Sequence, residues 1–378
     1  MLIYLVLTYL FFPFFQLKNF FVRKHKSKQI NKILLIQTAK IGDVVQTTPL
    51  FREIKRALPH LHLSVMVTPV TQEILLHNPY IDSLITFYPS EFKGLKGKLK
   101  LYKFLKNEEF DMVLILNMDI TYIITSYWTG IPYRISIKPD TYGFTKRLSF
   151  PLYTHLVFHH SNKLIIDTYF ELLKEALNID PVSKNKEIFF KNKEIFRVKH
   201  FFNKKQKPFI GIVISAGNKL KAIPVKKWIE ILKHLQKEVN GTFFLLGSQK
   251  DYKIAQEIVE YFNSPQIINT AGKFSLREVC AFVKNLNLLI GPDTGLIYIA
   301  DTFSIPIVHI PGPANFYEQH PWQSKWEFIR PEVDCAPCTF AFNTVNYCQK
   351  GTYECLEKLN PAEIAYCAKK LLTSVQDV

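Results

Sequence analysis

From residue 31 onward, short apolar runs alternate with longer amphipathic segments. The runs end in polar residues, as strands buried on both faces of a parallel sheet do. In the first half of the chain they lie at 32–37, 62–67, 83–87, 112–117 and 133–137. Segments with helical spacing lie between or after them, at 43–58, 70–77, 96–106 and 120–128. Strands separated by helices predict βαβ units, so we expect residues 31–180 to form a Rossmann-like domain on a parallel sheet.

The same alternation restarts after residue 207. Predicted strands lie at 209–215, 242–247, 266–270, 286–290 and 305–310, and predicted helices at 225–238, 252–261, 276–284 and 294–301. This second Rossmann-like domain spans 208–360, and a C-terminal helix is predicted at 361–378. Residues 181–207 are dense in Lys and lack Gly, which predicts a basic linker. We therefore expect an α/β protein of two doubly wound domains facing a cleft.

Ligands of doubly wound sheets bind at the carboxyl ends of the strands. The loops that follow the predicted strands are therefore expected to line the cleft. These loops are residues 38–43, 117–119, 215–221, 247–251, 270–273, 291–296 and 311–315.

An apolar segment precedes the first domain. Residues 1–17 are almost wholly apolar, and basic residues follow them, whereas a cleaved secretory signal has its positive charges first. The length is at the short limit for a span and Pro13 would kink the helix, so a helix lying in the membrane interface and a short anchor both remain open. We favour membrane association of residues 1–30. The alternatives are a buried N-terminal helix and a misassigned start.

The net charge of +16 is unevenly distributed. The first 42 residues contain no Asp or Glu, and their basic residues are Lys18, Arg23, Lys24, Lys26, Lys28, Lys32 and Lys40. A second basic stretch, Lys93 to Lys106, suits either a solvated helix face or a contact with lipid headgroups or an acceptor phosphate. The composition excludes global disorder, collagen and a small disulfide scaffold, and a mean hydropathy of +0.02 excludes a polytopic membrane protein.

The segment 290–300 is the first of two loops that carry candidate chemistry. It follows a predicted strand and enters a helix, and Gly291 and Gly295 permit close backbone approach. Asp293 and Thr294 stand at the N-cap, so the N–H groups of Thr294, Gly295 and Leu296 would point outward and could hold phosphate. An ordinary capped helix start would use the same residues. Neither G-x-G-x-x-G nor a P-loop motif occurs in the chain.

The second loop, 38–49, places Asp43 near the carboxyl edge of the N-terminal sheet. A carboxylate that faces a cleft can act as a general base on a hydroxyl. Alternatively, Asp43 caps the helix that follows. Thr48-Pro49 would equally serve as the start of that helix, with Pro in its first turn.

Four of the six cysteines lie close together in the sequence. Cys335, Cys338, Cys348 and Cys355 form a C-x2-C-x9-C-x6-C pattern within the segment 335–355. Such a set suits a tetrahedral thiolate site for a structural zinc ion. The alternative is that these are free or disulfide-linked structural cysteines.

A cluster of three histidines, His155, His159 and His160, also invites a metal hypothesis. We prefer to assign these histidines to the surface or the cleft edge of a Phe-rich loop.

Several segments together resemble one enzyme family. They are GDVVQTTPLFREIKRALP (42–59), SAGNKLKAIPVKKW (215–228), AGKFSLREV (271–279) and GPDTGLIYIADTFSIPIVHIPGP (291–313). The chain resembles glycosyltransferase family 9, the heptosyltransferases of lipopolysaccharide assembly, over roughly residues 32–370. G-D-V near the N-terminus combined with D-T-G near the C-terminus, at this separation, is a specific pattern.

The resemblance implies a GT-B fold and an inverting, metal-independent transfer from an ADP-heptose type of donor to a lipopolysaccharide-core or related glycolipid acceptor. It implies that catalysis needs no cofactor, that Asp43 is the catalytic base and that Lys221 stabilises charge on the leaving diphosphate. The residues it implies on the donor side are Gly217, Asp251, Asp293, Thr294, Gly295 and Leu296. On the acceptor side it implies Lys40 and Thr48.

Two positions depart from the family pattern. Tyr298 stands where the family often has His, and Lys221-Ala222-Ile223-Pro224 lacks the Trp of the K-x-W-P segment. Both lie near the expected donor sugar or phosphates, so they bear on the identity of the donor more than on the reaction class.

The expected partners are a nucleotide-sugar donor, a lipid-linked glycan acceptor and inner-membrane phospholipid, at the cytoplasmic face of the inner membrane, with no nucleic acid. Three alternatives were weighed. A transferase of another surface polysaccharide would use a different donor. A nucleic-acid-binding protein would explain the charge, but neither a helix-turn-helix nor an RNA-recognition signature is visible. An epimerase on the same architecture would only cleave the nucleotide–sugar bond.

Overall fold

The structure of the protein, a computed structural model, describes residues 2–25 and 29–374. Lys26 and Lys28 of the predicted basic flank lie outside the described residues. The chain divides into two compact units, Met1–Lys184 and Asn185–Val378.

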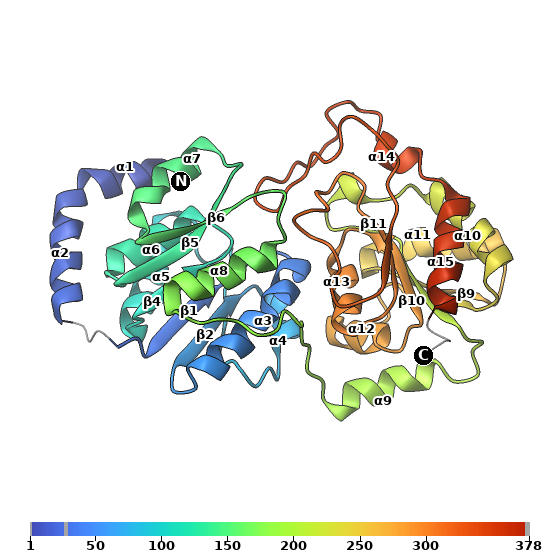
Figure 1. The fold of residues 1–378 in the computed structure, drawn as a ribbon, viewed down its shortest axis with the longest axis horizontal. Coiled ribbons are helices and arrows are strands. Elements are labelled where there is room, and N and C mark those ends of the chain that lie inside the picture. The colour runs from blue at the N-terminus through green and yellow to red at the C-terminus, as the bar shows by residue number, and fades with distance from the viewer. Residues whose placement is uncertain (1, 26–28, 375–378) are drawn as a thin grey trace. The chain divides into compact units, whose positions relative to one another are not determined.

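The first unit is built on a six-stranded parallel sheet (Figure 1). Its strands are β1 (Lys32–Ile36), β2 (His62–Val67), β3 (Ser83–Thr86), β4 (Met112–Ile115), β5 (Tyr133–Pro139) and β6 (His155–His159). Their order, β3-β2-β1-β4-β5-β6, is that of the dinucleotide-binding fold. Central β1 pairs with β2 and β4, so that Leu34 lies opposite Ser64 and Val113. Because both faces of β1 are covered, its apolar run is continuous rather than alternating.

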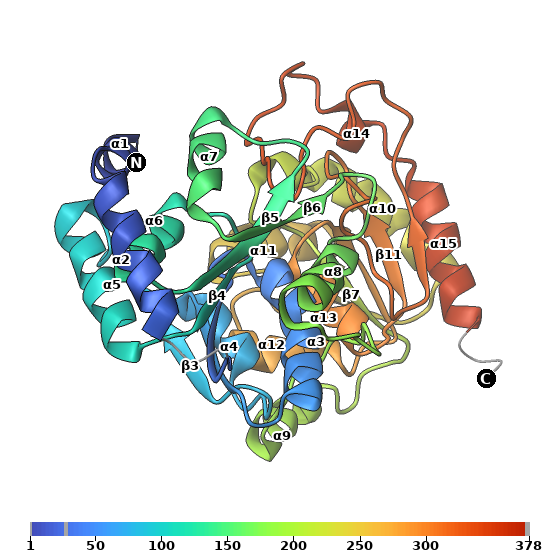
Figure 2. The ribbon, with the colours of Figure 1, turned by 60° about the vertical axis from the view of Figure 1, so that its left-hand side comes forward.

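Helices cover both faces of this sheet. They are α3 (Ile41–Ala57), α4 (Pro69–Leu75), α5 (Gly94–Glu108), α6 (Ile120–Thr129), α7 (Phe144–Ser149) and α8 (Ile165–Leu177). Helices α5 and α6 pack together over the face that carries Leu34, Ile36 and Val113. Helices α3 and α8 pack together on the other side (Figure 2).

The N-terminal apolar segment forms two helices instead of the single one expected. Helix α1 (Leu2–Leu10) and helix α2 (Phe12–His25) are bent by 70° relative to each other. Pro13 occupies the second position of α2, where the missing N–H costs least because a first-turn N–H has no acceptor within the helix. For the same reason, Pro13 cannot donate the backbone hydrogen bond that would continue α1 into α2. Among the described helices, none is long and apolar enough by itself to cross a membrane. Only α1 and the first part of α2, taken together, reach that length and composition.

The second unit repeats the topology of the first. Its strands are β7 (Phe209–Val213), β8 (Thr242–Leu246), β9 (Ile267–Asn269), β10 (Leu288–Pro292), β11 (Ile307–Ile310) and β12 (Trp326–Phe328). Read from its other edge, the sheet has the order β9-β8-β7-β10-β11-β12, which is that of the first sheet with β7 in the place of β1. Its helices are α9 (Asn192–Phe201), α10 (Val225–Glu238), α11 (Tyr252–Phe262), α12 (Leu276–Val283), α13 (Gly295–Thr302), α14 (Glu354–Glu357) and α15 (Pro361–Thr373). The prediction of an α/β protein with two Rossmann-like units is confirmed.

The predicted basic linker 181–207 contains a helix. Residues 192–201 form α9, which packs on α12 in the second unit and buries Val198. Arg277 Nε also donates to Glu194 Oε1 at 2.6 Å. Of the lysines that suggested a linker, Lys193 and Lys199 lie on the solvated face of this amphipathic helix, whereas Lys186 is buried. The predicted C-terminal helix is α15, which packs on α10 and ends at Thr373 (Figure 1).

The prediction that His155, His159 and His160 lie on the surface or cleft edge of a Phe-rich loop holds for His160, which follows β6 and is exposed, but not for the other two. His155 to His159 form edge strand β6, with His155 exposed and His159 fully buried. The His159 ring shares a hydrogen bond of 2.7 Å with Thr168 Oγ1. This strand begins and ends with His and mixes exposed with buried side chains. It therefore contains no long apolar run from which a strand would be predicted.

Candidate active site

Asp43 lies at the carboxyl edge of the first sheet, in the first turn of α3. Its carboxylate is half-buried, and Oδ2 accepts the backbone N–H of Lys40 at 3.0 Å. The positive end of the helix dipole favours a carboxylate at this position. The capping role left open by the sequence is therefore present. It holds the carboxylate at the edge where ligands of such sheets bind.

A set of hydrogen bonds surrounds this edge and joins residues from four elements. Thr38 Oγ1 lies 2.8 Å from Tyr122 Oη and accepts from Asn117 Nδ2 at 2.8 Å, which ties the loops after β1 and β4 together. Gln37 Nε2 donates to Tyr169 Oη at 3.3 Å. Burial, and secondly the nearby charge of Asp43, raise the pKa of Tyr169, so this phenol stays neutral. Neither tyrosine was predicted as a site residue, because both come from helices and the predicted site residues come from loops at strand ends.

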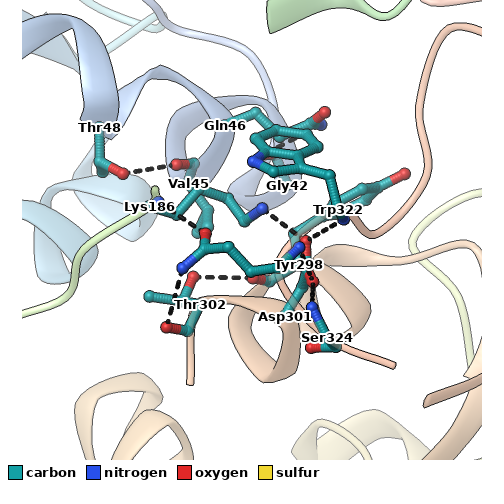
Figure 3. Close-up of polar contacts among 11 residues, drawn as sticks. Gly42, Val45, Gln46, Thr48, Lys186, Tyr298, Asp301, Thr302, Trp322 and Ser324 are labelled. Carbon is teal, nitrogen blue, oxygen red and sulfur yellow. Dashed lines mark hydrogen bonds and ion pairs between the residues drawn. The ribbon is translucent and has the colours of Figure 1, made fainter. Parts of the chain in front are cut away.

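The two predicted acceptor residues differ in their surroundings. Lys40 is exposed and precedes α3 directly. Thr48 lies within α3, which begins at Ile41 and not at Thr48-Pro49. Pro49 has no N–H to donate to Val45, and Thr48 Oγ1 donates to that carbonyl at 2.8 Å in its place (Figure 3). Five residues along a helix correspond to about 140° around its axis, so Thr48 does not lie beside Asp43.

In the second unit, the structure brings together Lys221 and Asp293. Lys221 Nζ lies 2.5 Å from Asp293 Oδ2, and both side chains are largely buried. Burial opposes ionisation of Asp293, but the Lys221 charge and the His309 imidazole outweigh it and hold the pKa of that carboxyl well below its usual range. The ammonium group has three donors, so the ion pair leaves Lys221 with hydrogen atoms for a second anion.

Tyr298 and His309 complete the surroundings of Asp293. Tyr298 Oη donates to Asp293 Oδ1 at 2.6 Å. His309, on β11, is fully buried with Nε2 3.7 Å from the same oxygen, and neither ring nitrogen has a hydrogen-bond partner in the described part of the chain. From the sequence, Tyr298 was distinguished only as a departure from the family pattern. His309 was not predicted, although a lone imidazole inside the apolar run 305–310 marks it.

Thr294, Gly295 and Leu296 lie where the sequence analysis placed them, at the start of α13 and immediately after β10 and Asp293. Thr294 is the N-cap residue, and its side chain makes no capping hydrogen bond. The N–H groups of the first helical turn have no intrahelical acceptor, which is the general basis of anion binding at helix N-termini. At Gly291, an added Cβ would lie only 2.6 Å from Val213 Cβ, so this glycine permits close packing of β10 on β7.

Gly217 and Asp251 lie in other loops at the same edge of the second sheet. Gly217 follows β7 and is exposed, with open space where a Cβ would stand. Asp251 follows β8, and its Oδ2 accepts from Ser248 N at 2.7 Å and from Ser248 Oγ at 2.6 Å. Its structural role is therefore a local cap, on a loop that ends at the ligand-binding edge.

A buried ion pair joins the start of the second unit to the end of α13. Lys186 Nζ lies 2.5 Å from Asp301 Oδ2, and neither side chain is exposed (Figure 3). The Asp301 carboxylate also accepts the backbone N–H groups of three consecutive residues: Trp322, Gln323 and Ser324. The Trp322 ring lies 3.2 Å from the ammonium group. Burial lowers the pKa of Lys186 to about 8, even though Asp301 favours the charged form.

The four clustered cysteines, Cys335, Cys338, Cys348 and Cys355, are free thiols in the structure. Burial, and secondly its three cysteine neighbours, raise the pKa of the Cys355 thiol to about 11. Cys348 differs, because backbone N–H groups, first that of Tyr353, point at its sulfur and lower its pKa. Within residues 2–25 and 29–374, no three His, Cys, Asp or Glu side chains are arranged to hold a metal ion. The structural zinc stays a prediction.

We expect the four thiols to react with iodoacetamide at different rates. Cys348 should be alkylated first at a pH of about 8, because the thiolate is the nucleophile and its pKa is lowered, while Cys355 should be the slowest. Mass spectrometry of peptides from a time course measures the order. If all four are protected until a chelator is added, the cysteines hold a metal. Equal rates at Cys348 and Cys355 would contradict the thiol environments described above.

Comparison with known proteins places the fold in one class. The structure matches a glycosyltransferase family 9 protein from Veillonella parvula with a TM-score of 0.76, at 19% identity over 92% of this chain and 100% of the other. It matches the Escherichia coli protein described as ADP-heptose lps heptosyltransferase II with a TM-score of 0.70, at 20% identity over 91% of this chain and 99% of that one. The two Rossmann-like units therefore form the GT-B type of fold found in glycosyltransferases.

Sequence comparison identifies the family. The profile described as glycosyltransferase family 9 (heptosyltransferase) matches residues 98–347. Lipopolysaccharide heptosyltransferase 1 of Campylobacter coli is 26% identical over 305 residues, which are 76% of this chain and 85% of the relative. The chain belongs to glycosyltransferase family 9, the heptosyltransferase family, and is a glycosyltransferase of lipopolysaccharide biosynthesis.

Proposed function

We propose that the protein transfers a heptose from ADP-heptose to a lipopolysaccharide-core or related glycolipid acceptor, with inversion at the anomeric carbon and without a catalytic metal. Asp43 takes the proton of the acceptor hydroxyl as its oxygen bonds to the anomeric carbon. The bond from that carbon to the diphosphate breaks in the same step, and ADP leaves. One base is sufficient for such a single displacement, since no covalent sugar–enzyme intermediate forms.

The observation that carries the proposal is the cation and helix terminus in the second unit. Lys221 is held beside Asp293, and Asp293 directly precedes the N-terminus of α13. An ammonium group and free backbone N–H groups are the donors that stabilise a leaving diphosphate, a task that a metal ion performs elsewhere. Asp293 is one of the predicted donor residues, and the other three, Thr294, Gly295 and Leu296, follow it directly in the sequence.

The relatives support heptose as the sugar. The relative from Campylobacter coli is a lipopolysaccharide heptosyltransferase, and the similar Escherichia coli structure is described as using ADP-heptose. A second candidate is transfer to another surface polysaccharide from a different nucleotide sugar. Tyr298 favours this candidate, because its hydroxyl occupies one oxygen of Asp293 at a position where the family often has His.

A transfer assay tests the proposal. ADP-, GDP- and UDP-sugars are incubated with the full chain and a crude glycolipid extract, and mass spectrometry detects the mass added to the acceptor. We expect addition of a heptose from ADP-heptose, in the presence of a chelator, and an increase in Tm with ADP but not with DNA. Transfer only from another nucleotide sugar would support the second candidate. A DNA-dependent Tm with no effect of nucleotides would overturn both.

Replacing Lys221 by Ala should slow transfer by about 100- to 1,000-fold in kcat, because charge on the leaving diphosphate loses its cation. Lys219→Ala is the matched control, since Lys219 is exposed on the same short helix, Lys219–Lys221. Initial rates at saturating donor, together with the Tm of both variants, provide the measurement. A lower Tm with an unchanged kcat would mean that Lys221 only stabilises Asp293.

A further inference from the structure

The outer face of the N-terminal helix pair is the most apolar exposed surface of the first unit. We call residues 2–19, which comprise α1 and the first part of α2, the elbow. Its exposed large hydrophobic side chains, at four- and three-residue spacings, are Leu2, Ile3, Val6, Leu7, Leu10, Phe11, Phe14 and Leu17, and the only exposed polar side chain among residues 2–19 is that of Gln16. Leu10 is 70% exposed and Phe14 66% exposed. This face has no charged residue.

The inner face of α1 carries its polar groups, which inverts the usual polarity of a surface helix. Leu5 is buried in the core of the unit and Thr8 is fully buried, while Tyr4 and Tyr9 are partly buried against that core. Thr8 Oγ1 accepts from Trp128 Nε1 at 2.9 Å, and Tyr9 Oη donates to the carbonyl of Leu148. A helix in water that places Thr and Tyr inside and only aliphatic side chains outside has its outer face arranged for an apolar medium.

The elbow is firmly attached to the unit. The Phe12 ring stacks on Tyr127 and the Phe15 ring on Trp128, with centroids 5.9 and 6.4 Å apart. Lys18 Nζ donates to the Trp128 carbonyl at 2.6 Å.

Helix α5, which lies beside α2 in Figure 2, also contributes to this attachment. Lys98 Nζ lies 4.2 Å from the centre of the Tyr4 ring. To span a membrane, the elbow would have to straighten, which would break these contacts. The contacts of the inner face with α5 and α6 therefore favour the bent form.

The charges next to the elbow are almost all positive. No acidic residue occurs in the sequence before Asp43, whereas Lys18, Arg23 and Lys24 do. Exposed leucines and lysines also alternate on α5, at Leu95, Lys96, Leu99 and Lys103. Apolar side chains beside cations are the pattern of helices that lie in the interface of an anionic bilayer.

We propose that the elbow is a monotopic docking element, whose outer face enters one leaflet of an anionic phospholipid bilayer while its inner face stays packed on the first unit. It neither spans the membrane nor acts as a free anchor. The inference rests on the proposed function in one respect: a lipid-linked acceptor requires the catalytic units to work at a bilayer. The elbow fixes which side of the first unit faces the lipid.

The test compares two pairs of substitutions in the full chain. Leu10→Glu with Phe14→Glu places two negative charges on the elbow. Phe196→Glu with Tyr366→Glu is the matched control, because these residues are 77% and 66% exposed and lie on α9 and α15 of the second unit. All four side chains are exposed, so the Tm of each double variant should stay close to that of the unaltered chain. Flotation with vesicles of phosphatidylethanolamine and phosphatidylglycerol, and with vesicles of phosphatidylcholine alone, measures binding.

We expect the unaltered chain and the control to float with anionic vesicles more than with neutral ones, and the elbow variant to bind more than about tenfold more weakly. Equal binding of the elbow variant and the control would overturn the proposal, as would the absence of binding by the unaltered chain. An N-terminal epitope cleaved by protease on the outside of spheroplasts would overturn it too, because it would show a span. Transfer to a deacylated, water-soluble acceptor should be the same for all three proteins, so failure of docking and failure of the proposed function are observed separately.

Discussion

Asp43→Asn is expected to reduce turnover by about 100- to 10,000-fold while leaving the affinity for the donor within a few fold. The amide retains an oxygen that can accept the Lys40 N–H, so the first turn of α3 keeps its cap. What is lost is the ability to take a proton from the acceptor hydroxyl. The affected quantity is therefore kcat, measured at saturating donor and acceptor, with Tm as the check on folding.

Asp119→Asn is the matched control for this variant. Asp119 also caps a helix at the carboxyl edge of the first sheet, where its Oδ1 accepts the N–H of Thr121 at 2.7 Å. If capping is the only role of such carboxylates, both variants should retain activity. Wild-type kcat in Asp43→Asn would remove Asp43 as the base. An equal loss in both would indicate an electrostatic effect of the whole edge.

Asp301→Ala is expected to destabilise the second unit by about 3–5 kcal/mol, because it leaves the buried Lys186 ammonium without its partner. The three backbone N–H groups of residues 322–324 lose their acceptor at the same time. Urea unfolding followed by tryptophan fluorescence can measure the loss, since Trp322 lies directly over Lys186.

A double-mutant cycle makes this prediction specific. Lys186→Met removes the charge but keeps an apolar stem of similar length, so Lys186→Met with Asp301→Asn should recover part of the stability lost in either single variant. Strict additivity of the two changes would show that the ion pair contributes nothing and that Asp301 acts only through residues 322–324. A loss below about 1 kcal/mol in Asp301→Ala would contradict the burial of the pair.

The sequence predicted the architecture because the central strands are continuous apolar runs. KILLI and FIGIV, the middle strands of the two sheets, stand out with no knowledge of tertiary structure. Strand β6 and helix α9 were missed because each mixes polar and apolar residues. In α9 only Glu194 and Val198 are buried, and charged residues stand between its apolar ones.

The residues of the candidate site likewise include some that could be predicted from the sequence and some that could not. Asp43 and Asp293 were found because they follow strands directly, and loops after parallel strands meet at one edge. Tyr169, His309 and Lys186 were not found as site or core residues, since their roles depend on partners distant in sequence. Lys186 is one lysine among many between 181 and 207, and nothing local distinguishes it from its solvated neighbours.

The imidazole of His309 has a thermodynamic consequence for the protein without bound donor. Neither ring nitrogen has a hydrogen-bond partner among the described residues, and Asp293 Oδ1 is 3.7 Å from Nε2, so burial of the ring costs about 1–3 kcal/mol. A ligand atom that satisfied His309 would remove this cost on binding, so part of the binding energy would appear as added resistance to unfolding. We therefore expect the second unit to be less stable without bound donor than with it. The donor would then stabilise the fold of the enzyme as well as serve as its substrate.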